Sequence, residues 1–372
     1  MSRLNRDFLE RMPKVELHVH LEGAVPRPAL DELARKYGTP PFRDLLDGMK
    51  TYPCGHKRSF ADFVVVWLKI GGLLREYEDY TFIARALAGE LNRQNILYAE
   101  VLFSPARDST AHLEPDRITE AVAKGFTEMP PAALACGFNT QASAAESDPQ
   151  AKPGAPAAVR LIADFVRDNG PREAGRTLDS LLAMNDPIIA GIGIGGSEAP
   201  FPPAPFAPVF EKSRAAGLRT QAHAGESAGP ESIWEAIRIL QVDRIAHGVR
   251  AREDAALMAY LKRTGLPLDV CPTSNVRTGA VENIADHPAA DFLRRGLKIS
   301  LSTDDPTLFG TDLAGEFESL IRTFGLAEDE VRMLLLNAVD AAWCGAEEKS
   351  RLVGAIEAFF GPAQNSKRSG PK

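Results

Sequence analysis

The sequence predicts an α/β protein that folds as a (β/α)8 TIM barrel with extra helices and one surface insertion. Three observations support this fold class. Strand-like apolar runs alternate with helical runs along most of the chain, eight strands can be counted, and no glycine-rich dinucleotide turn follows the first strand. A doubly wound open sheet is the alternative, and the missing glycine-rich turn argues against it.

The first strand is expected in the stretch from Lys14 to Gly23, where apolar and polar residues alternate and the glycine ends the strand. Side chains two residues apart on a strand point to the same face. His18 and His20 can therefore converge on one metal ion, with bonds of about 2.0–2.1 Å. Two surface histidines on an edge strand would give the same pattern, so further ligands are needed to decide.

The remaining elements follow in alternation. Seven more strands are expected at Ile96–Phe103, Val159–Val166, Ile188–Ile194, Arg219–His223, Arg244–His247, Leu266–Cys271 and Lys298–Thr303. Helices are expected at Pro28–Tyr37, Ser59–Leu74, Glu78–Asn95, Asp116–Glu128, Arg172–Met184, Ala204–Ala216, Pro230–Leu240, Asp254–Arg263 and Pro288–Arg295. The apolar stripe of the second helix, which includes Phe60 and Phe63, is typical of a core-facing helix, with a substrate lid as the alternative.

Residues 1–346 are expected to form one domain, because strands and helices alternate throughout this range. Within it, a stretch at about 130–156 is rich in small and polar residues and is predicted to be a low-complexity surface insertion. Residues 347–372 are expected to form a C-terminal segment that ends in a disordered polar tail.

Composition limits the kinds of partner. The net charge of −7 and the pI near 5.6 argue against nucleic acid and favour a small-molecule substrate. The four cysteines are widely separated, so neither a disulfide framework nor a thiolate metal cluster is indicated. The most hydrophobic run, Phe63–Leu74, is interrupted by Lys69 and is too short to span a bilayer. A cytoplasmic protein without a membrane partner is expected, and the oligomeric state stays open.

Polar residues that could bind a metal or take part in catalysis lie at the C-terminal ends of four predicted strands. They are His18 and His20 on the first strand, His223 on the fifth, His247 on the sixth, and Asp304 and Asp305 on the eighth. Active sites of barrels are built at this end. Three histidines with one carboxylate suit zinc and leave room for a water. Taken alone, His247 could be a core histidine and Asp305 a helix cap, but their common location favours a catalytic site.

Several motifs carry a resemblance to a known family. They are Glu-Leu-His-Val-His-Leu-Glu-Gly, Tyr-Ala-Glu-Val-Leu-Phe-Ser-Pro, Gly-Ile-Gly-Gly-Ser-Glu, His-Ala-Gly-Glu, Arg-Ile-Ala-His-Gly, Cys-Pro-Thr-Ser-Asn and Ser-Thr-Asp-Asp-Pro. With these motifs the sequence resembles the adenosine deaminase family of zinc aminohydrolases, roughly from Pro13 to Trp343. The match is weakest at Pro130–Pro156.

The resemblance implies a set of functional residues. It implies one Zn²⁺ per chain held by His18, His20, His223 and Asp304, catalysis by Glu226, His247 and Asp305, and substrate contacts from His20, Glu22, Phe63, Ser104 and Gly196. The Gly196 N–H is expected to meet N3 of a purine. Relatives that hold two metals place a bridging lysine or glutamate at the end of the fourth strand, and the glycines found there imply a single ion.

The expected reaction is hydrolytic deamination of a 6-aminopurine, with adenosine or an adenosine-like nucleoside as the leading substrate. Adenine and 6-aminodeoxyfutalosine are alternatives, because adenosine-preferring members resemble one another in having aspartate where this chain has Glu22 and usually also where it has Gly193. Glu22 is expected at the mouth of the site, in contact with substrate. There are two competing functions. The protein could be a non-catalytic barrel that binds a purine, or an amidohydrolase that acts on a non-purine ring.

Overall fold

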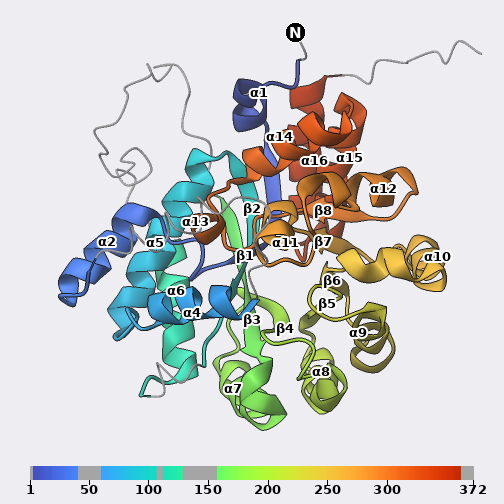
Figure 1. Cartoon of the computed structure of the whole chain (residues 1–372). Coiled ribbons are helices and arrows are strands. Elements are labelled where there is room, and N and C mark those ends of the chain that lie inside the picture. Colours follow the sequence, from blue (N-terminus) through green and yellow to red (C-terminus); the bar gives the residue numbers. More distant parts are fainter. Residues whose placement is uncertain (1–2, 41–59, 107–111, 129–156, 362–372) are drawn as a thin grey trace, which may run out of the picture.

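Eight parallel strands form the centre of the molecule and helices surround them (Figure 1). The computed structural model describes residues 3–40, 60–106, 112–128 and 157–361, with side chains from residue 65 onward in the second range. The strands are hydrogen-bonded in chain order from β1 to β8. The predicted (β/α)8 fold class is therefore confirmed.

The elements have the following bounds. The strands are β1 (Lys14–His20), β2 (Ile96–Phe103), β3 (Ala158–Val166), β4 (Ile189–Gly195), β5 (Arg219–Ala224), β6 (Arg244–His247), β7 (Leu268–Val270) and β8 (Ile299–Leu301). The helices up to β6 are α1 (Arg6–Arg11), α2 (Arg27–Lys36), α4 (Phe60–Gly71), α5 (Tyr77–Arg93), α6 (Pro115–Thr127), α7 (Gly170–Met184), α8 (Ala207–Ala215) and α9 (Pro230–Glu235). Those after β6 are α10 (Ala255–Thr264), α11 (Pro272–Arg277), α12 (Ala289–Arg294), α13 (Pro306–Phe309), α14 (Leu313–Phe324), α15 (Glu328–Ala341) and α16 (Ala346–Phe360).

The strand boundaries agree closely with the sequence prediction at β2 and β6, which match it residue for residue. β7 and β8 are shorter than predicted, at three residues each. One predicted helix, Pro230–Leu240, changes to a π-helical turn after Glu235. Such deviations are common at the ends of elements, where hydrogen bonding becomes irregular.

The barrel closes between β1 and the segment just after β8. The His20 N–H donates to the Asp304 carbonyl at 2.8 Å, and the Asp304 N–H donates to the His18 carbonyl at 3.0 Å. These bonds form a parallel bridge between Val19 and Asp304. The backbone contact that closes the barrel therefore brings three polar side chains from opposite ends of the chain together.

The interior of the barrel also contains an ionic network, which we call the inner-barrel network: Glu100, Gln221, Arg244 and Asp269. The Arg244 guanidinium is fully buried and lies 2.6 Å from Glu100 Oε2 and 2.7 Å from Asp269 Oδ2. Gln221 Oε1 accepts a hydrogen bond from Arg244 Nη2 at 2.8 Å. Arg244 begins β6, so the network lies one strand length from His247, which ends it.

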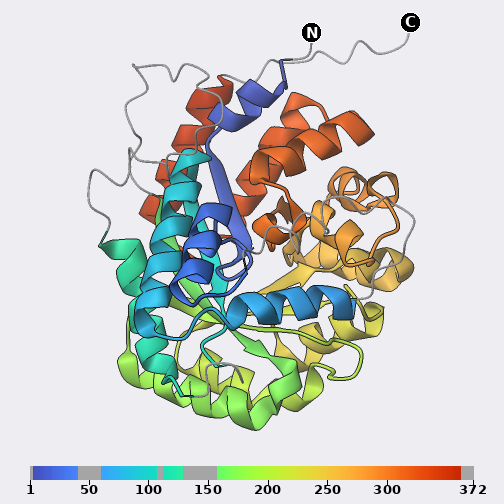
Figure 2. The same cartoon turned by 60° about the vertical axis from the view of Figure 1, so that its left-hand side comes forward.

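Helices outside the predicted set cover one side of the barrel. α16 crosses the predicted boundary at residue 346 and buries Leu352, Ile356 and Phe360. The Phe8 ring of α1 lies 4.8 Å from the Phe359 ring, between centroids, so the first and last described helices pack together (Figure 2). The division at residue 346 stays a prediction, and the predicted insertion and polar tail lie outside the described residues. Among the described helices, none is both long and apolar enough for a membrane span.

Candidate active site

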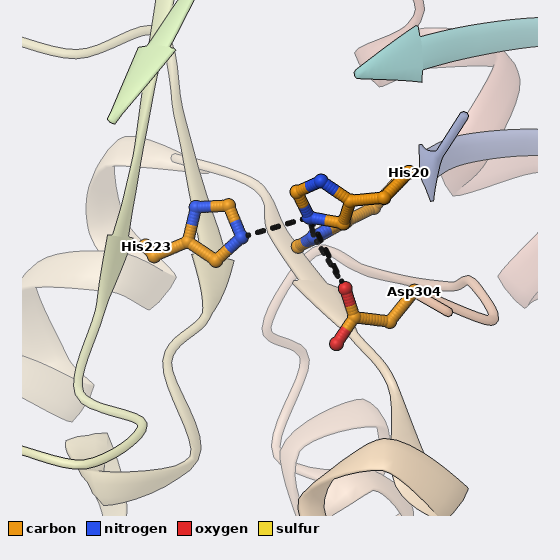
Figure 3. Close-up of side chains that lie close together, drawn as sticks. His20, His223 and Asp304 are labelled. Carbon is orange, nitrogen blue, oxygen red and sulfur yellow. Dashed lines mark hydrogen bonds and ion pairs between the residues drawn. The ribbon is translucent and has the colours of Figure 1, made fainter. Parts of the chain in front are cut away.

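Four side chains converge at the C-terminal ends of β1 and β5 and just after β8. His20 Nε2 lies 3.3 Å from His18 Nε2, 3.3 Å from His223 Nε2 and 3.2 Å from Asp304 Oδ1. Figure 3 shows His20 between His223 and Asp304, with the rings and the carboxylate turned toward one point. Ligands bonded tetrahedrally to zinc at about 2.0–2.1 Å lie roughly 3.3 Å from one another. The four residues therefore fit a tetrahedral metal ion, and all four are buried.

Charge at this point is shared between the imidazoles and the carboxylate. Burial lowers the pKa of His18 to about 4 and holds the pKa of His223 well below its usual value, so both rings are neutral. Burial also disfavours the charged form of His20, but the hydrogen bond to Asp304 and the nearby carboxylates outweigh it and raise its pKa to about 10. A cation is therefore favoured here, and either a proton on His20 or a metal ion supplies it.

Two outer contacts orient these side chains. His223 Nδ1 bonds the Ile194 carbonyl at 2.9 Å, which fixes its proton on Nδ1 and turns the Nε2 lone pair toward the other three residues. The Ser274 hydroxyl donates to Asp304 Oδ2 at 2.6 Å, so Oδ1 remains directed at the histidines. Asp304 itself has φ of +66°, a left-handed conformation that non-glycine residues rarely adopt and that is found mainly at functional sites.

Glu226 is held in place by a carboxylate that the sequence analysis did not single out. Glu198 accepts hydrogen bonds from four successive backbone N–H groups, of Gly225 at 2.5 Å, Glu226 at 3.1 Å, Ser227 at 2.8 Å and Ala228 at 3.0 Å. Glu198 ends the Gly-Ile-Gly-Gly-Ser-Glu motif, and a charged residue directly after a strand end was the available signal. Its contacts fix the turn after β5 that carries Glu226.

The pKa of the Glu226 carboxyl is raised above its usual value. Burial is the main cause, His247 opposes it, and the neighbouring charges of Asp304 and Glu198 raise the pKa further. The Thr278 hydroxyl lies 3.0 Å from Glu226 Oε1 and 3.1 Å from the Ser274 carbonyl. A hydroxyl has one proton and a carbonyl only accepts. Thr278 can therefore donate to only one of these two oxygens at a time, and its hydrogen bond to Glu226 lowers the pKa of that carboxyl.

Helix α11 contacts three parts of the site at once. Ser274 bonds Asp304, Asn275 Nδ2 lies 3.0 Å from His247 Nδ1, and Thr278 bonds Glu226. The motif Cys-Pro-Thr-Ser-Asn was recognised in the sequence, but these contacts were not predicted, because they depend on where the short strand β7 ends. His247 Nε2 in turn lies 3.6 Å from Glu226 Oε2.

Asp305 lies against the first strand-to-helix connection. Its side chain is buried, and its Oδ1 has no hydrogen-bond partner among the described residues. Burial and the adjacent Asp304 carboxylate raise its pKa well above the usual value. A Cβ at Gly23 would lie 1.6 Å from Asp305 Oδ1, so only glycine leaves space for this carboxyl.

A cavity of about 250 Å³ connects these groups with solvent. Eight of the predicted site residues line it: His20, Ser104, Gly196, His223, Glu226, His247, Asp304 and Asp305. His18 lies behind them, at the metal group. The Phe63 side chain lies outside the described residues.

Glu22 does not lie at the mouth of the site, where the sequence analysis expected it. Its side chain is fully buried, and Oε1 accepts a hydrogen bond from the Ser104 N–H at 3.1 Å. The reason is local, since the peptide N–H that follows β2 attracts the carboxylate away from the cavity. Ser104 lines the cavity, whereas Glu22 is not among its lining residues.

Asp164 on β3 also lines the cavity and was not predicted. Its side chain is 4% exposed and Oδ1 has no hydrogen-bond partner among the described residues. A Cβ at Gly193 would lie 2.5 Å from Asp164 Oδ1, and one at Gly195 would lie 2.6 Å from Oδ2. The carboxyl therefore lies over two glycines of β4. Burial raises the Asp164 pKa to about 7. An aspartate near the C-terminal end of a strand whose only other charged residue is Arg160 was the signal in the sequence.

Comparison with known proteins is consistent with this site. A family profile described as adenosine deaminase matches residues 13–359. Adenine deaminase of Bordetella parapertussis is 35% identical over 91% of this chain and 99% of its own length. Aminodeoxyfutalosine deaminase of Streptomyces avermitilis is 31% identical over 95% of this chain and 92% of its own length.

Solved structures agree. Adenine deaminase from Arthrobacter aurescens superposes with a TM-score of 0.82 at 28% identity, covering 94% of this chain and 99% of that one. An amidohydrolase from Burkholderia ambifaria with bound zinc superposes with a TM-score of 0.79 at 26% identity, covering 97% of this chain and 94% of that one. The chain thus belongs to the adenosine deaminase family and is an aminohydrolase that acts on a purine.

Proposed function

We propose that the protein catalyses the zinc-dependent hydrolytic deamination of a 6-aminopurine, which yields the 6-oxopurine and ammonia. The observation that carries this proposal is that the His18, His20, His223 and Asp304 group and Glu226, a carboxyl whose pKa is raised by burial, meet at one cavity. The Burkholderia structure contains zinc, which supports the choice of metal. Zinc bound by these four residues would lower the pKa of a water in the site to about 7.

One ion per chain is proposed. A second group that could hold a metal, His247 with Cys271 and Asp304, shares Asp304 with the first. Cys271 is buried, and burial raises the pKa of its thiol well above the usual value, so the thiolate that a metal needs is disfavoured. The second group therefore does not provide an independent site.

The protein residues account for each proton in the reaction. As a water oxygen adds to C6, one water proton passes to His247 or Asp305, and Glu226 donates its proton to N1. When the C6–N6 bond breaks, the leaving amine takes the first proton back and departs as ammonia. The hydroxyl proton on C6 returns to Glu226, and the C6 carbonyl forms. N1 keeps its hydrogen, and the Gly196 N–H holds the purine edge at N3.

An adenosine-like nucleoside is the first candidate substrate. The cavity extends from the metal group outward to Trp67 and Leu68 on α4 and to Asp168 and Asn169 after β3. A purine bound with C6 at the metal group would direct its N9 substituent away from the metal, toward these residues. The Streptomyces relative, named for a substrate larger than adenine, supports space for such a substituent.

Adenine is the second candidate, and the position of Glu22 favours it. A carboxylate that recognises a sugar must reach the cavity, whereas Glu22 is fully buried, bonds the Ser104 N–H and does not line the cavity. The Bordetella relative is named adenine deaminase. The two candidates can be separated by following the release of ammonia from adenosine, deoxyadenosine, adenine and 6-aminodeoxyfutalosine, and the release of methylamine from N6-methyl-AMP. Turnover of none of these would contradict the proposed function.

Glu22→Ala tests the role of the sugar directly. If Glu22 accepts a hydrogen bond from a sugar hydroxyl, the variant loses about 1.5–3 kcal/mol of binding, and kcat/KM for the nucleoside falls about 10- to 150-fold. Adenine, which lacks the hydroxyl, is barely affected. Equal losses on nucleoside and free base would show that Glu22 acts by supporting Ser104 instead.

A further inference from the structure

The outer wall of the cavity is formed in part by the loops that follow β3 and β4. Asp168 and Asn169 follow β3, Gly196 and Ser197 follow β4, and all four residues line the cavity. Asp168 Oδ2 accepts a hydrogen bond from the Ser197 N–H at 2.9 Å, which joins the two loops. Only Gly196 has a role in the proposed reaction, so the function of the Asp168 carboxylate is open.

The Asp168 carboxylate lies beside the proposed position of the purine. A Cβ at Gly196 would lie 2.5 Å from Asp168 Oδ2, and Gly196 has φ of +95°, so both the space and the backbone conformation require glycine here. The Gly196 N–H is proposed to hold N3 of the purine. Because N3 and N9 are bonded to the same carbon atom, C4, a carboxylate next to Gly196 lies near N9 and its substituent.

One oxygen of Asp168 is available to a substrate. The residue is exposed, and none of the residues that the structure describes forms a hydrogen bond with Oδ1. Asp164, the other β3 carboxyl in the cavity, lies near the metal group instead, with Oδ1 3.9 Å from His223 Nδ1. Glu22, which was expected at the mouth, does not line the cavity. Asp168 is therefore the carboxylate that faces the N9 side of a bound purine.

The charge of the wall favours an uncharged substrate. Among the described residues that line the cavity, none is lysine or arginine. Arg167, directly before Asp168, is not part of the lining, because its guanidinium is fully buried and bonds the carbonyls of Phe201, at 2.9 Å, and His223. A phosphate group on the N9 substituent would meet a carboxylate with no cation from these residues to pair with, whereas an uncharged hydrogen-bond donor fits Oδ1.

We propose that Asp168 determines specificity on the N9 side of the purine: its Oδ1 accepts a hydrogen bond from an uncharged donor, and its negative charge rejects a phosphate. The substrate class is then a neutral 6-aminopurine that carries a donor at N9 or on its N9 substituent. Two sources supply such a donor, the N9–H group of adenine and a hydroxyl group of a nucleoside. The inference rests on the proposed deamination for the orientation of the purine and for the measurement of rates.

The rates of the wild type give the first test. We expect kcat/KM for AMP to be at least about 10²-fold below that for the better of adenine and adenosine, because the phosphate brings a second negative charge toward Asp168. Ammonia release by the zinc-loaded full-length chain measures the three rates. A difference of less than about tenfold would overturn the proposal.

Asp168→Asn changes the group that faces the cavity and keeps the size of the side chain. When the amide oxygen accepts from the Ser197 N–H, the NH₂ group takes the place of Oδ1 and donates. We expect kcat/KM for the better neutral substrate to fall about 10- to 150-fold, and that for AMP to rise at least about tenfold, with zinc content unchanged. A loss of structure cannot produce changes of opposite sign, so equal losses on all three substrates would overturn the proposal.

9-Methyladenine separates the two sources of the donor, because it has neither an N9–H group nor a hydroxyl group. If N9–H is the donor, Asp168→Asn should slow adenine and leave 9-methyladenine within about threefold of the wild-type rate. If a sugar hydroxyl is the donor, the variant should slow adenosine and leave both free bases within about threefold. A loss on 9-methyladenine as large as that on the better substrate would overturn the proposal.

Asp186→Asn is the matched control. Asp186 lies in the loop before β4, at the other end of that strand, and its Oδ1 accepts a hydrogen bond from the Ile188 N–H at 2.9 Å. The variant makes the same change of charge outside the cavity. It should match the wild type on every substrate, and a specificity change like that of Asp168→Asn would overturn the proposal.

Binding of the reaction products separates this inference from the proposed function. Hypoxanthine, inosine and IMP differ on the N9 side as the three substrates do, and calorimetry measures their binding to the zinc-loaded chain without turnover. We expect IMP to bind at least about 10²-fold more weakly than the better of the other two, and Asp168→Asn to reduce this difference. If no purine is deaminated, the proposed function fails, but this binding pattern still supports the role of Asp168. Equal binding of the three, or binding of none, would overturn it.

Discussion

The barrel contains two buried ionic clusters with opposite designs. In the inner-barrel network, one arginine lies between two carboxylates, 2.6 Å from Glu100 and 2.7 Å from Asp269. At the C-terminal end, Asp304, Asp305 and Glu226 lie close together among histidines. The first cluster contains its own cation. The second favours a cation that the side chains supply only as a proton on His20.

The two clusters are therefore expected to serve different purposes, one in the stability of the fold and the other in function. The fold tolerates a buried charge that is paired and hydrogen-bonded, while one left without a partner costs free energy. Asp305 Oδ1 and Asp164 Oδ1 have no hydrogen-bond partner among the described residues, and both side chains line the cavity. Such atoms are available to a ligand. We call the group at the C-terminal end, which consists of the metal-binding residues together with Glu226, His247 and Asp305, the upper cluster. We therefore expect changes in the upper cluster to alter metal binding and turnover, and changes in the inner-barrel network to alter stability.

The largest effect is expected for His18→Ala, which removes one of the four metal ligands. Metal content and turnover should be lost together, with activity reduced at least about 10³-fold, because the remaining groups have no ion to complete the site. Metal analysis and ammonia release measure the two losses. His112→Ala, at an exposed histidine, is the control. Full turnover by a metal-free variant would contradict the assignment of the upper cluster as a metal site.

Arg244→Met makes the corresponding change in the inner-barrel network. It leaves Glu100 and Asp269 buried without their cation, which should cost about 3–5 kcal/mol of unfolding free energy. Urea unfolding measures the loss. Arg219 begins the neighbouring strand β5 and its exposed guanidinium pairs with Asp243 at 2.8 Å, so Arg219→Met should cost about 1 kcal/mol or less. Similar losses in the two variants would mean that the buried network does not stabilise the fold.

Glu226→Gln removes a proton donor from the upper cluster without removing a ligand. Metal content should stay at the wild-type level while kcat falls at least about 10²-fold, because the amide cannot protonate N1. Glu231→Gln, on the exposed start of α9, is the matched control. Near-normal deamination by Glu226→Gln would exclude this residue as the acid.

The sequence predicted the barrel and the residues of the upper cluster better than it predicted the hydrogen bonds that hold those residues in place. Strands such as β2 and β6 were found with their exact bounds from local apolar periodicity, and the strand ends located His223 and Glu226. The roles of Glu198 and Asn275 were missed, since each contacts a residue on another strand through a register that only the closed barrel sets. Glu22 was expected at the mouth because periodicity says nothing about which neighbouring N–H a long side chain will bond.

The smallest effect concerns His287, which lies outside the cavity and supports the upper cluster through Asn275, whose Oδ1 is 3.1 Å from His287 Nε2. Its folded-state pKa is lowered to about 3 from 6.5 by burial and by the charges of Arg252 and His247. A lowered pKa means that the unfolded chain takes up a proton first as the solution is acidified. Stability from neutral His287 is therefore complete above about pH 6.5 and is lost as the pH falls toward 3, at about 1.4 kcal/mol per unit.

Between pH 6.5 and pH 5, the wild type should lose up to about 2 kcal/mol more than His287→Asn, whose side chain does not titrate. Urea unfolding at several pH values measures the two slopes, and the difference between them removes the contribution of other groups. His112→Asn should keep the wild-type slope. Parallel slopes for the wild type and His287→Asn would mean that the His287 site tolerates a proton.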